Sequence, residues 1–398
     1  GRSQTFLGLS GPRRCSAARG IPFSMGYVLI SFLSWLILRF LVLRRLPCGR
    51  PARTILSCLF FLPILYYPYL QASCFIVLPE PSFGTAILMG AWCGTVLIAA
   101  PPASAGVLCL MRFGRKKPMR RVGAGACLIF SLFFSSVLVL CGLREGLSVP
   151  SVQEVSVNLP AGCDALDGIR MAVISDLHLG CATPPGWLEE TLRRIKEARA
   201  DIILLDGDLS DGRPEDRRSD LARLGTLEAP LGVWAVPGNH EYYVDYAGIM
   251  AALPDSVHVL ANSHAKLRTS RGTFVLAGVT DRKARARGLP GPDIEKALSG
   301  LSGDGAIGPV LLMSHRPAGW SRNAARGVVL QICGHTHGGQ FIWNRLFLRL
   351  IGRRYLHGLF ERNSSLLWVG SGASQWFGFP LRVGVPPEIA VLNLHAGS

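Results

Sequence analysis

Residues 171–178 read MAVISDLH, and residues 201–208 read DIILLDGD. Each stretch is a short apolar run that ends at an aspartate, which is typical of a buried strand followed by polar groups. Between them Leu188, Leu192 and Ile195 recur at helical spacing, with basic residues at the positions between. The two stretches therefore predict a strand–helix–strand unit, which is how an α/β domain begins.

The same pattern continues to the end of the chain and predicts eight strands. They are expected at Arg170–Ser175, Asp201–Leu205, Val233–Val236, Phe274–Ala277, Val310–Met313, Val328–Cys333, Leu366–Val369 and Ile389–Leu394. Most of these strands end in a polar cluster. In open α/β folds ligands bind at the carboxyl ends of the strands, so we expect a site where these clusters meet.

The polar clusters have the composition of a metal site. They are Asp176 and His178 in SDLHLG, Asp208 in DGDLSD, Asn239 and His240 in PGNHE, His315 in SHRP, and His335 and His337 in GHTHGGQ. Mixed oxygen and imidazole ligands suit Mn, Fe or Zn. Because one carboxylate can bridge two cations, the set predicts two divalent metal ions about 3.5–4 Å apart, a spacing suited to displacement at phosphorus.

The order DxH, GD, GNHE, SHxP and GHTHGG resembles the calcineurin-like metallophosphoesterase superfamily over residues 168–395. The GHTHGGQ form is similar to that of its bacterial membrane-associated phosphodiesterase branch, as is the tail from Tyr355 through Gly372 and Arg382 to PPEIAVLNL. The resemblance implies an α/β sandwich of two mixed sheets flanked by helices. It also implies hydrolysis of a phosphomonoester, phosphodiester or pyrophosphate bond.

Carried over residue by residue, the resemblance implies roles for the polar clusters. One metal would be held by Asp176, His178, Asp208 and His337, and the other by Asp208, Asn239, His315 and His335. Asp208 would bridge the metals, and a hydroxide shared by them would be the nucleophile. His240 matches the catalytic residue that stabilises the phosphoryl oxygens or protonates the leaving group, and it is not a ligand.

Several polar residues near these motifs have a plainer interpretation. Asp206 and Asp211 flank Asp208 and are expected to cap or turn the loop. Gly238 and Gly334 are expected to allow close approach of the backbone. His357 follows the active-site segment, so a substrate contact is the minority interpretation for it, and a surface or core position is the majority one.

The first 150 residues differ in composition from the rest. They hold 16 Lys and Arg against 2 Asp and Glu, out of totals of 42 and 26. Four apolar stretches, about 21–43, 54–78, 84–110 and 122–143, are long enough to cross a bilayer, which takes roughly 20 residues. We therefore expect an N-terminal tail at 1–20, a four-helix transmembrane region at 21–143, a connection at 144–165 and a metallophosphoesterase domain at 166–398.

The basic loops predict the orientation in the membrane. The loops around Arg50 and Lys116 are rich in Lys and Arg, which favour the cytoplasmic side, whereas the turn at 79–83 has none. The catalytic domain is therefore expected outside the cytoplasm, on a multi-pass protein of the cell membrane. Arg13, Arg14 and Arg19 argue against an external N-terminus, and a start at Met25 would remove that conflict.

Other function classes fit the sequence less well. A transporter needs ionisable residues inside its spans, and apart from Arg39 there are none. The soluble part is nearly neutral, which does not favour nucleic acid as a partner. The remaining alternative is a membrane receptor or scaffold that uses an inactive phosphoesterase fold as a binding module.

The segment after GHTHGGQ predicts a short basic amphipathic helix. Trp343 and Phe347 alternate with Arg345 and Arg349 at helical spacing, so these four are predicted membrane or substrate contacts. Such a helix beside the metal site favours membrane lipids as partners and a lipid-linked or phospholipid substrate. The alternative is that the apolar residues pack into the core of the domain.

Overall fold

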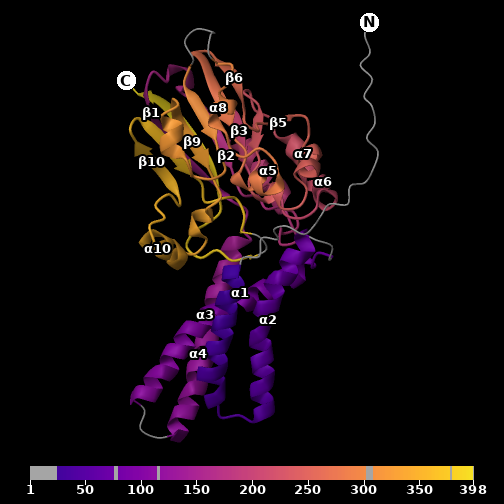
Figure 1. Cartoon of the computed structure of the whole chain (residues 1–398), viewed down its shortest axis with the longest axis vertical. Coiled ribbons are helices and arrows are strands. Elements are labelled where there is room, and N and C mark those ends of the chain that lie inside the picture. Colours follow the sequence, from indigo (N-terminus) through magenta and orange to yellow (C-terminus); the bar gives the residue numbers. More distant parts are fainter. Residues whose placement is uncertain (1–24, 76–78, 114–116, 302–307, 377–378, 398) are drawn as a thin grey trace.

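The computed structural model describes residues 25–75, 79–113, 117–301, 308–376 and 379–397. A helical bundle and an α/β domain meet end to end, and the bundle extends away from the domain (Figure 1). The predicted tail at 1–20 lies outside the described residues.

The described residues of the bundle form the α-helices α1 (Met25–Ile37), α2 (Arg50–Phe75), α3 (Phe83–Phe113) and α4 (Lys117–Gly146). Three helices in the described part are long and apolar enough to cross a membrane, at Arg50–Leu70, Phe83–Phe113 and Pro118–Gly146. Leu88, Ile129 and Phe133 on them are about 70% exposed, as expected of side chains that face lipid rather than a protein core.

Four membrane spans are predicted from the sequence, and three of them are candidate spans in the described structure. The first predicted span, 21–43, begins outside the described residues, and α1 has only 13 residues. It continues as a π-helical turn, Leu38–Val42, and a 3₁₀ turn, Leu43–Arg45, which pack against α2 and α3 through Leu38 and Val42. At about 1.5 Å per residue, α1 alone is too short to span the roughly 30 Å hydrocarbon core.

The α/β domain contains two six-stranded mixed sheets. The first sheet has the order β1 (Ser151–Ala161), β12 (Glu388–Gly397), β2 (Arg170–Ile174), β3 (Ile202–Asp206), β4 (Val233–Val236) and β5 (Val257–Val259). The second has the order β10 (Gly358–Arg362), β11 (Ser365–Val369), β9 (Val328–Cys333), β8 (Val310–Met313), β7 (Gly272–Gly278) and β6 (Ser263–Thr269). All eight predicted strands are present, and the connection expected at 144–165 includes β1.

The two sheets pack face to face around one apolar core. Met171 and Leu204 from the first sheet contact Leu311, Leu330 and Trp368 from the second within one buried cluster. The α-helices in the described part of the domain are α5 (Trp187–Glu197), α6 (Pro214–Arg223), α7 (Tyr246–Ala252), α8 (Ile294–Ala297), α9 (Trp320–Ala324) and α10 (Ile342–Leu350). The result is the α/β sandwich with flanking helices that the sequence predicts.

The domain docks on the bundle through the loop at 379–384. The backbone N–H of Arg382 donates to Gly142 O of α4 at 3.0 Å, and Gly94 of α3 lies so close to Leu381 that an added Cβ would be 2.3 Å from its Cδ1. Glu80, between α2 and α3, forms an ion pair with Arg217 of α6. The loop that reaches the bundle is thus the one that precedes β12.

Candidate metal centre

The carboxyl ends of β2, β3, β4, β8 and β9 lie at one edge of the sandwich and carry the polar residues of the five motifs. Five of these residues have positive φ, which is costly for a residue with a side chain: Asp176 (55°), His178 (42°), Asp208 (51°), His335 (69°) and His337 (47°). Such strain concentrates at functional sites because the surrounding structure has to compensate for it. The strain is therefore consistent with side chains that must converge.

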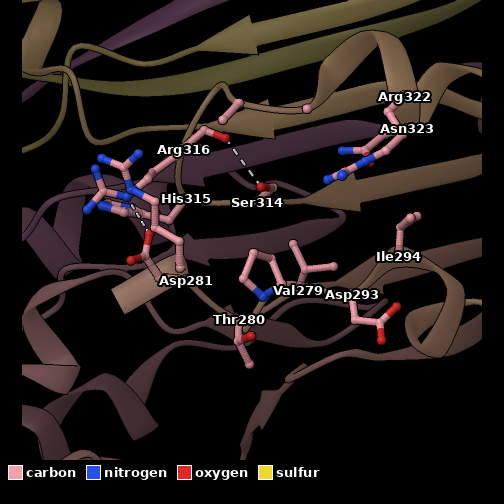
Figure 2. A pocket seen from close by; sticks show the side chains of 14 residues that line it. Val279, Thr280, Asp281, Asp293, Ile294, Ser314, His315, Arg316, Arg322 and Asn323 are labelled. Carbon is pink, nitrogen blue, oxygen red and sulfur yellow. Dashed lines mark hydrogen bonds and ion pairs between the residues drawn. The ribbon is translucent and has the colours of Figure 1, made fainter. Parts of the chain in front are cut away.

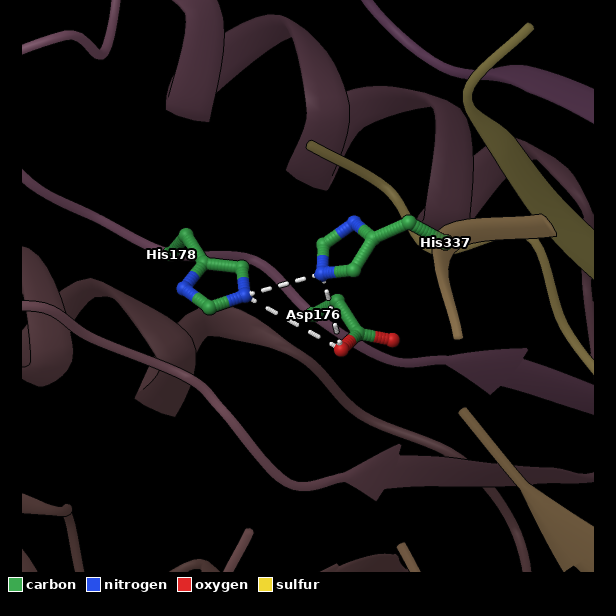
Figure 3. Close-up of side chains that lie close together, drawn as sticks. All are labelled: Asp176, His178 and His337. Carbon is green, nitrogen blue, oxygen red and sulfur yellow. Dashed lines mark hydrogen bonds and ion pairs between the residues drawn. The ribbon is translucent and has the colours of Figure 1, made fainter. Parts of the chain in front are cut away.

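Asp176, His178 and His337 form the first group (Figure 3). His337 Nε2 lies 3.4 Å from Asp176 Oδ1 and 3.2 Å from His178 Nε2, and all three residues are buried. His178 Nε2 is 3.9 Å from the same carboxylate oxygen. One carboxylate oxygen and two imidazole nitrogens therefore point at a common centre.

Asp208, His315 and His335 form the second group. Asp208 Oδ2 lies 3.0 Å from His315 Nε2 and 3.8 Å from His178 Nε2 of the first group. Asp208 is thus placed between the two groups, where a bridging carboxylate is needed. Asn239, at the end of β4, directs Oδ1 toward Arg316 Nη2 at 2.6 Å, while its Nδ2 donates to the Tyr243 hydroxyl.

Three imidazoles are oriented by acceptors on their outer side. His315 Nδ1 lies 2.7 Å from Asp206 O, His337 Nδ1 lies 3.2 Å from Ser374 O, and His178 Nδ1 lies 3.1 Å from the Asp211 carboxylate. A carbonyl oxygen can only accept, so His315 donates from Nδ1 to Asp206 O, and its Nε2 faces the carboxylate of Asp208. Metal-ligating histidines are held in this way, and the donor set therefore fits divalent metal ions.

Asp211 has a larger role than the loop cap expected from its position. Its buried carboxylate accepts from the Nδ1 atoms of both His178 and His240. Burial alone would raise the pKa of Asp211, but the charges and hydrogen bonds of the two imidazoles outweigh burial and hold that pKa well below its ordinary value. Asp211 therefore links a predicted ligand to the predicted catalytic histidine.

Glu241, the last residue of the PGNHE motif, holds the loop around Asp208. Its Oε1 accepts from the N–H of Leu209 at 2.7 Å, and its Oε2 accepts from Gly238 at 2.7 Å and from Asp208 at 3.2 Å. The N–H of His240 donates to Asp208 Oδ1 at 2.8 Å. Gly238 permits this approach, because an added Cβ would lie 2.2 Å from Asp208 Oδ1.

The histidines differ in their preferred charge. Burial lowers the pKa of both His335 and His337, reinforced by Arg316 for the former and by His178 and Arg382 for the latter. Burial also opposes charge on His178, but the carboxylates of Asp211, Asp208 and Asp176 raise its pKa to about 9. Neutral imidazoles and ionised carboxylates are the forms that ligate metal, so cations would complete the charge balance of this site.

Two arginines adjoin the predicted ligands. Arg316 pairs with Asp281 (Figure 2). It also contacts both His335 Nε2 and Asn239 Oδ1, so its cationic group lies between two residues of the second predicted ligand set. Arg382 is fully buried, donates to Ser371 O at 2.7 Å and lies 3.3 Å from His337 Nδ1. Neither arginine is predicted from the sequence to belong to the site.

The structure brings all seven predicted ligands and His240 to one edge of the sandwich. It keeps His357 out of the two groups, because His357 Nε2 pairs with Glu388 at 3.0 Å. Trp343, Arg345, Phe347 and Arg349 lie on α10, which begins five residues after His337. No α10 residue is buried, so the alternative that its apolar residues pack into the core is contradicted.

Comparisons with known proteins agree with this geometry. Residues 169–339 match the family model described as calcineurin-like phosphoesterase. An uncharacterized metallophosphoesterase of Helicobacter pylori is 34% identical over 257 residues, covering 64% of this chain and 66% of its own length. A Danio rerio protein named transmembrane protein with metallophosphoesterase domain is 29% identical over 275 residues, covering 67% and 62%. The chain thus spans just under two thirds of the length of these relatives.

Proposed function

Because residues 169–339 belong to the calcineurin-like phosphoesterase family, we propose that this chain is a membrane-anchored phosphoesterase that uses two divalent metal ions. The observation that carries the proposal is the convergence of three Nε2 atoms on the carboxylates of Asp176 and Asp208, with the Nδ1 atoms held from outside. When bound, two such ions lower the pKa of water and neutralise charge on a phosphoryl group.

Asp208 and His240 have different proposed roles in the reaction. Asp208 lies between the two groups and its loop is fixed by Glu241, so we assign it the bridge. His240 Nε2 lies 3.9 Å from Asp208 Oδ2, and its Nδ1 is held by Asp211. We assign His240 the transfer of a proton to the leaving group, because Asp211 orients its ring and Nε2 faces the predicted metal centre.

The alternative function, a receptor or scaffold with an inactive fold, makes the opposite prediction for catalysis. The test is Mn-dependent hydrolysis of bis(4-nitrophenyl) phosphate by the full chain in non-ionic detergent. The His240→Ala variant should keep the metal content of the wild type and lose roughly 10²-fold in kcat. A wild-type chain that binds Mn but hydrolyses no activated ester would support the scaffold instead.

We propose further that the substrate is amphiphilic. The support is α10, whose apolar side chains Trp343, Leu346, Phe347 and Leu350 are 41–86% exposed while Arg345 and Arg349 lie on the same helix. A basic helix with an exposed apolar face lies on anionic lipid. Figure 1 places α10 at the end of the domain that faces the bundle.

An apolar cavity beside α10 also supports an amphiphilic substrate. It has a volume of about 470 Å³ and lies between the bundle and the domain, with Ile98 and Leu138 on one side and Phe341, Trp343 and Phe379 on the other. That volume falls within the range of roughly 300–1,000 Å³ usual for small-molecule sites. We propose that it accepts a lipid chain.

The test is to replace Trp343, Phe347 and Arg349 by Ala, Ala and Glu. Turnover of a phospholipid in vesicles should fall while turnover of a soluble ester is retained, because the exposed side chains of α10 support no core. Equal loss on both substrates, with a lower melting temperature, would mean that α10 is needed for folding and not for the membrane.

We propose that the bundle crosses the cell membrane with α1 and its continuation as the fourth span. The start of α2 and the C-terminal end of α3 lie at the end of the bundle away from the domain (Figure 1). These helix ends carry Arg50 and Arg112, and basic residues there favour an extracytoplasmic catalytic domain. A protease added to intact cells should therefore digest that domain. Protection until lysis would overturn the orientation.

A further inference from the structure

A basic pocket with a volume of about 440 Å³ adjoins the metal centre at His335. Four of its twelve lining residues are arginines and none is acidic, and the arginines come from three separate segments of the domain. They are Arg282, Arg316, Arg353 and Arg354. We call these four residues the arginine pocket.

The charge of this pocket is largely uncompensated. Arg316 pairs with Asp281, which Figure 2 shows beside it. In the described part of the chain, the side chains of Arg282, Arg353 and Arg354 form no hydrogen bond and no ion pair. Like charges that converge without partners repel one another, so the pocket is suited to an anion with several acceptor oxygens.

The position of the pocket limits what that anion can be. His335 forms part of its wall and also belongs to the second predicted ligand set. A phosphate on the metals and an anion among the arginines would therefore be neighbours. Leu348 of α10 lines the same pocket, so an amphiphile held at α10 could reach it with its polar end.

We propose that the arginine pocket binds a second phosphate group of the substrate, one that is not hydrolysed, so that the substrate carries at least two phosphates. This inference rests on the proposed phosphoesterase function. Arginine suits the role because its planar guanidinium binds phosphate oxygens in pairs. A metal ion bound by Asn239 Oδ1 and His335 Nε2 would displace Arg316 from these two atoms. The guanidinium of Arg316 would then be available to bind the substrate.

The first test compares two soluble diesters that differ in one group. Glyceryl 4-nitrophenyl phosphate is compared with its 3-phosphorylated form, using the full chain with Mn in non-ionic detergent and no vesicles. The second phosphate should raise kcat/KM at least about tenfold through a lower KM, since hydrogen bonds between charged groups are the strong ones. Added salt should shrink this preference.

The variants assign the preference to the pocket. The double variant Arg353→Gln/Arg354→Gln should bring the ratio of kcat/KM for the two esters close to one, and Arg353→Glu/Arg354→Glu should invert it. Arg268→Gln is the matched control, because Arg268 is an exposed arginine of β6 outside the pocket, and it should keep the wild-type ratio. A preference that survives in the double variant would refute the inference.

A binding measurement separates this inference from the proposed function. The full chain, freed of metals with a chelator, is titrated with inorganic phosphate by calorimetry at low ionic strength. The wild type should bind phosphate, and the Arg353→Gln/Arg354→Gln variant should bind it at least about tenfold more weakly. Equal affinity of the wild type and the variant for phosphate would refute the proposed phosphate subsite, whether or not either ester is hydrolysed. A chain that binds Mn but hydrolyses neither ester would refute the proposed phosphoesterase function instead.

The final arm tests whether these arginines contact lipid headgroups of the bilayer instead. The wild type and the double variant are compared for adsorption to phosphatidylglycerol and to phosphatidylcholine vesicles. If the variant loses adsorption to the anionic vesicles but keeps the preference for the bisphosphorylated ester, the arginines are membrane contacts and the inference is wrong. Loss of the preference with adsorption retained supports the substrate subsite.

Discussion

Asp211→Asn should weaken metal binding although Asp211 is not a predicted ligand. The carboxylate accepts from Nδ1 of both His178 and His240, and it is buried. The amide oxygen of an asparagine at this position can accept from only one of the two imidazoles. Its NH₂ group then faces the other imidazole, from which it cannot accept a hydrogen bond. It also removes the negative charge that polarises His178.

The magnitude follows from what such outer partners contribute at known metal sites. Their loss lowers metal affinity by about 10–100-fold. That range corresponds to about 1.4–2.8 kcal/mol, at 1.4 kcal/mol per tenfold change. The fall in kcat should be larger than the fall in affinity explains, since His240 loses the same partner.

The assay is Mn titration of the chelator-treated full chain by calorimetry, with kcat on an activated diester measured at saturating Mn. Asp206→Asn is the matched control, because Asp206 is also buried and its carboxylate forms no hydrogen bond to an imidazole among the described residues. Burial raises the pKa of Asp206 well above its ordinary value, so the amide resembles its protonated form. If the affinity of Asp211→Asn for Mn is within twofold of that of the control, the proposed role of Asp211 in orienting His178 and His240 is refuted.

Three further outcomes are expected. Gly238→Ala should displace the Asp208 carboxylate and lower both Mn content and turnover. In the control Gly327→Ala an added Cβ meets nothing within 4 Å, so it should lower only the stability, by roughly 1–2 kcal/mol for its left-handed backbone. Equal turnover of the two variants would contradict the close approach of Gly238 to Asp208. Burial raises the pKa of Glu80 despite the nearby Arg217, so ionisation of Glu80 lowers the stability of the folded chain as the pH rises through that raised pKa. Glu80→Gln should therefore have the melting temperature of the wild type at pH 4 and the same or a higher one at pH 7. Arg217→Ala should lower that melting temperature instead, because it leaves Glu80 buried without its partner.

The sequence predicts the central strands because their signal is strong. β2, β3, β8 and β9 are buried on both faces and appear as apolar runs, interrupted only by Gln331 in the interior of β9. The strands not predicted, β1, β5, β6 and β10, lie at or beside sheet edges, where half of the side chains face solvent. In β6, Lys266 and Arg268 are exposed, so its apolar content is too low to stand out.

The ligand set could be predicted because each residue follows a strand end within a short motif. Asp211, Arg316 and Arg382 could not, since their importance arises from contacts between segments distant in the chain. Arg382 is 45 residues from His337, and only the fold brings them together. One signal was available for Asp211, because it is the third aspartate of the DGDLSD motif that contains Asp208.

The measurement that tests the central claim most directly is the metal content of the full chain and of Asp208→Asn, each purified with Mn and assayed on an activated phosphodiester. Asp208 lies 3.0 Å from His315 and 3.8 Å from His178, so its loss should affect both metal positions. We predict two Mn per wild-type chain with turnover, and at most one Mn with no turnover in the variant. Two Mn and wild-type turnover in Asp208→Asn would contradict the two-metal account.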